Sequence, residues 1–136
     1  MAERKPGWFG RRLNSRARRD YMRVRERDLD TQRLADEGRY GELADALGQL
    51  VRDYARQTSI EGHTRSSLMA WIRRCDALIR AGRRSQAITE AGALRGMLVQ
   101  YEGPDGELAG MLQQTIAAAT RKQLGSASDS QQPLAS

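Results

Sequence analysis

Two similar stretches of sequence decide the fold: residues 34–40 read LADEGRY, and residues 78–84 read LIRAGRR. In each stretch, a run of apolar residues at helical spacing is followed by the pair Gly-Arg. A glycine just after a helix is typical of the C′ position, where the backbone is left-handed. Because another apolar run begins within a few residues, the sequence predicts tight turns between helices at Gly38 and Gly82.

Apolar residues recur every three or four positions through most of the chain, as Leu68, Ile72, Cys75 and Ile79 do. This spacing places them on one face of a helix. No segment shows the sustained two-residue alternation of a half-buried strand. We therefore predict an all-α protein of five helices. Their expected positions are about 12–37, 40–57, 64–81, 84–101 and 105–122.

The similarity extends beyond the two turns when the chain is aligned with itself at an offset of 44 residues. Leu34 then matches Leu78, and the matched pairs are mostly apolar residues or glycine. A single helical hairpin cannot bury its apolar face alone, whereas stacked hairpins share a continuous core. The sequence thus predicts an array of antiparallel helical hairpins, with the fifth helix closing the open end.

The pattern L-x-x-x-G-R-x-x-x-A resembles the tetratricopeptide (TPR) repeat, in its long-helix variety. It stands at Leu78, Gly82-Arg83 and Ala87, and in the first copy Leu43 takes the place of the final alanine. The resemblance implies a TPR-like scaffold that binds peptides or proteins on a concave face, rather than a catalyst.

Charge and composition divide the 136-residue chain into three parts. Residues 1–27 hold ten basic and three acidic residues, so this N-terminal arm accounts for the overall net charge of +6. Residues 28–122 hold the predicted helical domain. Residues 123–136 are rich in Ser and Gln and are expected to form a disordered tail. The single cysteine and the absence of an apolar leader favour a cytoplasmic protein.

The basic arm, PGWFGRRLNSRARRDYMRVRER, is predicted to begin the first helix, with an apolar stripe and arginines around most of the remaining surface. The candidate contact arginines are Arg11, Arg12, Arg16, Arg18, Arg19 and Arg23. Trp8 and Phe9 are candidate aromatic contacts. Three interpretations stay open. The stripe can dock on the helical body and leave a solvated basic face, the arginines can bind nucleic-acid phosphates, or the arm can lie on an anionic membrane.

A second cluster of basic residues surrounds the Gly82 turn. Its members are Arg73, Arg80, Arg83 and Arg84. Such a cluster can extend a nucleic-acid surface or receive an acidic peptide, although a solvated face is the ordinary outcome.

Residues for catalysis are few. His63 is the only histidine, Cys75 is the only cysteine, and no glycine-rich phosphate loop is present. We therefore expect no enzymatic activity, cofactor or metal. The leading hypothesis is a protein-interaction scaffold for a partner protein or acidic peptide. The other two hypotheses are a nucleic-acid-binding protein and a structural component of a phage or other assembly. The sequence leaves the oligomeric state open.

Overall fold

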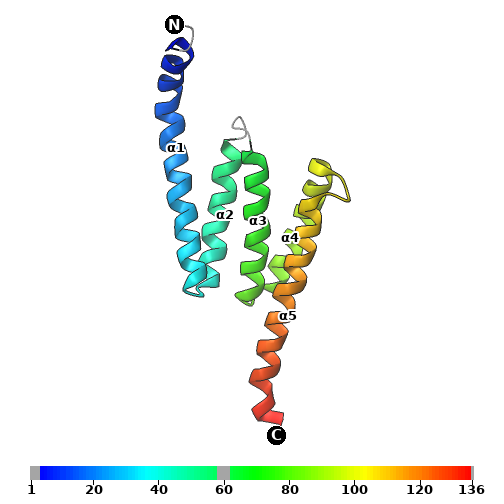
Figure 1. Ribbon diagram of the computed structural model, residues 1–136. Coiled ribbons are helices and arrows are strands. Elements are labelled where there is room, and N and C mark those ends of the chain that lie inside the picture. Colours follow the sequence, from blue (N-terminus) through cyan, green and yellow to red (C-terminus); the bar gives the residue numbers. More distant parts are fainter. Residues whose placement is uncertain (1–3, 58–61, 136) are drawn as a thin grey trace.

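The computed structural model describes the backbone of residues 4–57 and 62–135, and side chains within residues 18–57 and 62–124. Five helices follow one another: α1 (Arg4–Asp36), α2 (Tyr40–Arg56), α3 (His63–Arg80), α4 (Arg84–Glu102) and α5 (Glu107–Ala135) (Figure 1). No described residue lies in a strand. The predicted all-α helical array is confirmed, and the three middle helices match their expected bounds to within one residue at each end.

The two outer helices are longer than the sequence predicted. α1 begins at Arg4 rather than near residue 12. Pro6 lies in its first turn, where a missing N–H group breaks no helical hydrogen bond. α5 continues to Ala135 rather than ending near residue 122. Extending an existing helix by one residue costs far less free energy than starting a new one. The polar composition of residues 123–135 therefore did not by itself indicate where α5 ends.

The turns after α1 and α3 have the same geometry. Gly38 and Gly82 have φ values of +70° and +81°, in the left-handed region. The Gly38 N–H donates to the Ala35 carbonyl, as the Gly82 N–H does to the Ile79 carbonyl. The next N–H, from Arg39 or Arg83, donates to the carbonyl of Leu34 or Leu78. This pair of bonds is the Schellman motif, so both hairpins turn by the same backbone device.

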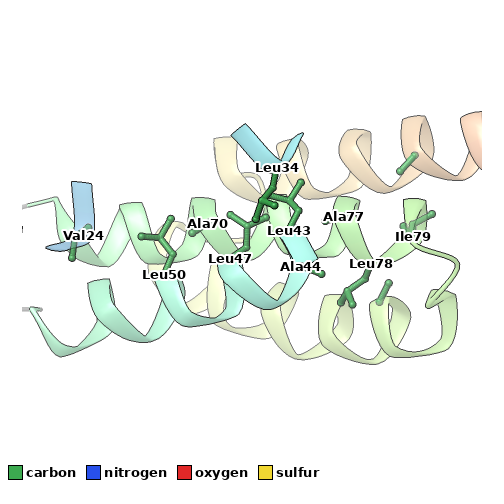
Figure 2. Close-up of a cluster of buried hydrophobic side chains, with 12 residues drawn as sticks. Val24, Leu34, Leu43, Ala44, Leu47, Leu50, Ala70, Ala77, Leu78 and Ile79 are labelled. Atoms are coloured by element: carbon green, nitrogen blue, oxygen red, sulfur yellow. The ribbon is translucent and has the colours of Figure 1, made fainter. Parts of the chain in front are cut away.

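The core consists of two clusters of buried side chains, and α3 contributes residues to both. The first joins α1, α2 and α3, with one alanine each from α4 and α5, and Leu43, Leu47, Leu50 and Leu78 are among its buried members (Figure 2). The second joins α3, α4 and α5. Its buried residues are Leu68, Ile72, Cys75, Ala91, Leu94, Leu98, Leu108 and Leu112. The backbone of α3 lies against those of α2, α4 and α5, so α3 is the centre of the array.

Among the described residues, the backbone of α1 lies close to that of α2 and of no other helix. Both outer helices extend past the body, α1 beyond the end of α2 at its N-terminus and α5 in the opposite direction at its C-terminus (Figure 1). The predicted arm is therefore continuous with the first helix of the body, with no break near residue 27.

Candidate interaction surfaces

A groove with a volume of about 490 Å³ lies where α1, α2, α3 and α5 meet. Its lining is mainly apolar. The residues are Ala35, Tyr40, Leu43, Leu47, Met69, Ile72, Arg73, Asp76, Arg80, Met111 and Thr115. Met69 is 39% exposed at this surface, although its neighbours Leu47 and Ile72 belong to the buried core. The groove thus gives solvent access to the apolar seam between the helices.

Arg73 links α3 to α1 across this groove. Its guanidinium donates to Asp28 Oδ1 and to Thr31 Oγ1, each at 3.2 Å. Thr31 is fully buried, and its hydroxyl donates to the Asp28 carbonyl at 2.6 Å. The Arg73 side chain therefore bridges two helices whose backbones are not in contact.

The other three members of the predicted second basic cluster have no partner in common. Arg80 pairs with Asp76 at 3.0 Å, and its guanidinium lies 5.5 Å from the centre of the Tyr40 ring. Arg83 pairs with Asp45 at 3.3 Å. Arg84 is exposed and has no ion-pair partner among the described side chains. Three of the four arginines, Arg73 included, thus pair with carboxylates.

A partly buried polar junction joins α2, α3 and α4, and sequence reasoning missed it. Arg74 Nε lies 2.7 Å from Glu90 Oε1, and Arg74 Nη2 lies 3.0 Å from Glu90 Oε2. The Ala44 carbonyl of α2 accepts a third bond from Arg74 Nη1 at 2.5 Å. Trp71 Nε1 and Gln86 Nε2 also donate to Glu90, each at 3.0 Å. The bidentate Arg74 bond lowers the pKa of Glu90, against the opposing effect of burial.

Gly48 of α2 makes room for this junction. A Cβ atom at position 48 would lie 2.6 Å from Arg74 Nη1. Glycine in mid-helix costs about 1 kcal/mol relative to alanine, so its presence in the buried part of α2 was the available sequence signal. The physical reason for a glycine at position 48 is the close approach of the Arg74 guanidinium to the α2 backbone.

The arm arginines occupy the outer part of α1. Arg18, Arg19 and Arg23 are exposed. The backbone at Arg11, Arg12, Arg16, Trp8 and Phe9 is helical, whereas their side chains lie outside the described residues. Val24 of the same helix is buried in the first core cluster, and Arg27 Nε lies 2.7 Å from Asp53 Oδ2 of α2. One side of α1 therefore docks on the body from residue 24 onward.

His63 and Cys75 lie on α3 in structural surroundings. The His63 ring packs edge-on against Tyr54, with 5.3 Å between ring centres. The Cys75 side chain is fully buried. Burial, together with the nearby Glu90 carboxylate, raises the pKa of Cys75 to about 11. The thiol is therefore protonated near neutral pH, which disfavours nucleophilic chemistry.

The raised pKa of Cys75 makes stability depend on pH. The unfolded chain loses this proton near pH 9, whereas the folded chain keeps it until about pH 11. The free energy of unfolding should therefore fall by about 2 kcal/mol as pH rises across that window. Urea unfolding from pH 8 upward, under reducing conditions, measures this fall. Cys75→Ala should remove this part of the pH dependence, and parallel wild-type and variant profiles would contradict the assignment.

Comparison of the chain with protein-family models, curated proteins and solved structures gave no match in any of the three. Within the described residues, no helix has the length and apolar character needed to cross a membrane. What the structure defines is a class: a five-helix, all-α array compatible with a helical-repeat protein.

Proposed function

We propose that this protein is a non-enzymatic interaction module that binds a segment of a partner protein in the groove between α1, α2, α3 and α5. The observation that carries the proposal is the 490 Å³ groove itself, with an apolar floor and the exposed Met69 side chain. Grooves of this kind bind amphipathic helical segments by accepting a few apolar anchors.

The repeated hairpin supports the same proposal. Two turns 44 residues apart use the same hydrogen bonds, and both follow the L-x-x-x-G-R pattern that resembles the TPR repeat. TPR-like arrays place alternate helices on one concave face. The groove is lined by residues of the first, third and fifth helices and also by Tyr40, Leu43 and Leu47 of α2.

The charges at the groove favour an acidic flank on the partner segment. Arg80 donates to Asp76 through Nε, and a guanidinium has five N–H donors in all. A partner carboxylate near Arg80 would therefore find donors that the Asp76 pair does not use. We propose apolar anchors for affinity and one or two flanking carboxylates for orientation.

Met69 offers a direct test because an exposed side chain can be changed with little cost to folding. The probe is a displayed random-peptide library, selected on the full chain. Selected peptides should carry apolar residues at helical spacing with an acidic flank, and Met69→Glu should weaken their binding at least about tenfold. Ile88→Glu is the matched control, because Ile88 is 57% exposed on α4 and does not line the groove.

The result expected for the control is unchanged peptide binding. Equal weakening by Met69→Glu and Ile88→Glu, or a selection that enriches no peptide, would contradict binding in the groove.

A further inference from the structure

The side of α1 that faces away from the body is a separate charged surface. Val24 and Thr31 are buried toward the body, and Arg27 is paired with Asp53 of α2, so these residues mark the docked side. Advancing about 100° per residue from them places Arg18 and Arg25 together on one outer flank. Arg19 and Arg23, four residues apart, lie together on the other.

The arginine register continues along the projecting backbone. Arg11 is seven residues before Arg18, on the same flank, and Arg12 and Arg16 precede Arg19 and Arg23 by helical steps. The α1 backbone is one continuous helix through all these positions. Two rows of arginine positions therefore run along α1, separated by roughly a third of its circumference.

Three of these arginines carry a positive charge that no described carboxylate offsets. Arg18, Arg23 and Arg25 are exposed, and no described acidic side chain pairs with them. Eight other arginines pair with carboxylates, namely arginines 27, 33, 39, 65, 73, 74, 80 and 83. Among the described side chains, arginines 52, 56, 84, 95 and 121 also have no ion-pair partner, but they are spread over α2, α4 and α5. Residues 18–25 of α1 thus hold four exposed arginines, the densest such group among the described side chains.

A shallow concavity of about 620 Å³ lies between the two rows. Its lining residues are Arg18, Arg19, Met22, Arg23 and Glu26. Met22 and the acidic Glu26 lie between the two rows, so the surface presents positive charge along two edges with one carboxylate between them.

We propose that this outer face of α1 binds a DNA duplex through its phosphates, without reading the base sequence. The B-form major groove is about 12 Å wide and admits an α-helix. A helix lying in that groove brings one row of arginines toward the phosphates of each strand. The backbone of α1 extends past the end of α2 (Figure 1).

The same surface fits a membrane or an RNA duplex less well. A helix that lies on a bilayer needs an apolar face to enter the acyl region. Tyr21, Met22 and Leu29 are the exposed large apolar side chains among residues 18–30, and they do not form one continuous face, whereas Val24 is buried in the core. The major groove of A-form RNA is too deep and narrow for side chains to read.

A salt titration of the full chain with a short fluorescein-labelled DNA duplex tests this proposal. Binding should be seen by anisotropy at about 50 mM salt, and the logarithm of the association constant should fall against log salt with a slope of about −3 to −5. Neutralising Arg18, Arg23 and Arg25 together by glutamine should weaken binding at least about tenfold and reduce that slope by about 3.

The matched control neutralises Arg84, Arg95 and Arg121, which are exposed elsewhere and change net charge by the same amount. It should bind DNA within about twofold of the original chain. Circular dichroism of both variants should show unchanged helix content.

Four outcomes would overturn the proposal. They are equal weakening by both variants, no DNA binding at low salt, tighter binding to an RNA duplex of the same length, and binding to phosphatidylglycerol vesicles without binding to DNA. None of them affects the groove test, because Met69 lies on α3 at a different surface.

Discussion

Replacing Leu78 by alanine should lower the free energy of unfolding by about 4 kcal/mol, measured by urea unfolding followed by circular dichroism. Leu78 is fully buried in the first core cluster, near the end of the central helix α3 (Figure 2). The substitution removes its contacts and leaves a cavity that the rigid helical packing fills only partly. The Leu78 carbonyl, which accepts the Arg83 N–H in the turn, is kept in the alanine variant.

The equivalent residue of the first repeat provides a sharp comparison. Leu34 holds the same place in the Schellman turn, but it is 6% exposed and belongs to α1, whose backbone contacts α2 alone. Leu34→Ala should therefore cost only about 2–3 kcal/mol. Met97→Ala, at a side chain 47% exposed, should cost less than about 0.5 kcal/mol. If Leu78→Ala and Met97→Ala cost the same, the proposed position of the core is wrong.

Replacing Arg74 by alanine should lower the free energy of unfolding by about 3 kcal/mol. The Arg74 and Glu90 side chains are only 16% and 20% exposed. Removing the arginine therefore leaves the partly buried Glu90 carboxylate without its positively charged partner. The Ala44 carbonyl loses its bond to Nη1 as well. Because Arg74 joins three helices, the Arg74→Ala variant should unfold at a lower urea concentration or in a less cooperative transition.

Acidification gives a second readout of the Arg74–Glu90 pair. Arg74 lowers the pKa of Glu90, so the pair stabilises the folded chain above the ordinary glutamate pKa of 4.5. That contribution is lost as pH falls through the lowered pKa. The stability of Arg74→Ala should therefore depend less on pH than that of the original chain in this acid range. Identical acid profiles would count against the pair.

Gly48 supplies a control for the geometry of the same junction. Gly48→Ala should destabilise the original chain, because the new Cβ atom meets the Arg74 guanidinium. In the Arg74→Ala background, the same change should be neutral or stabilising by up to about 1 kcal/mol, as alanine favours helix. Gly96→Ala, whose Cβ meets nothing within 4 Å, should be stabilising in both backgrounds. Additive costs of Gly48→Ala and Arg74→Ala would show that the two sites do not interact.

Local features of the sequence predicted the helices well. The three- and four-residue spacing of apolar side chains located all five, and Gly38 and Gly82 lie at the left-handed ends of α1 and α3. Both signals act over a single turn of chain, so neither requires knowledge of distant residues. The outer helix ends were harder to predict, because helix propagation through residues 123–135 depends little on hydrophobic pattern.

The charged residues were less predictable because their partners lie far away in sequence. Arg73 and Arg74 are adjacent, yet the first pairs with Asp28 of α1 and the second with Glu90 of α4. Nothing in local spacing indicates either pairing. The cluster around Gly82 therefore looked like one basic patch, whereas the structure divides it among several ion pairs.

The sequence by itself determined the helical class, the repeated Gly-Arg turn and the concentration of arginine in the first 27 residues. The tertiary structure alone decided which arginines keep an unpaired charge and where the apolar seam opens into a groove. The physical reason is the distance along the chain over which each kind of interaction acts. Helix and turn preferences are set by neighbours along the chain, whereas charge pairing and surface shape are set by residues that only folding brings together.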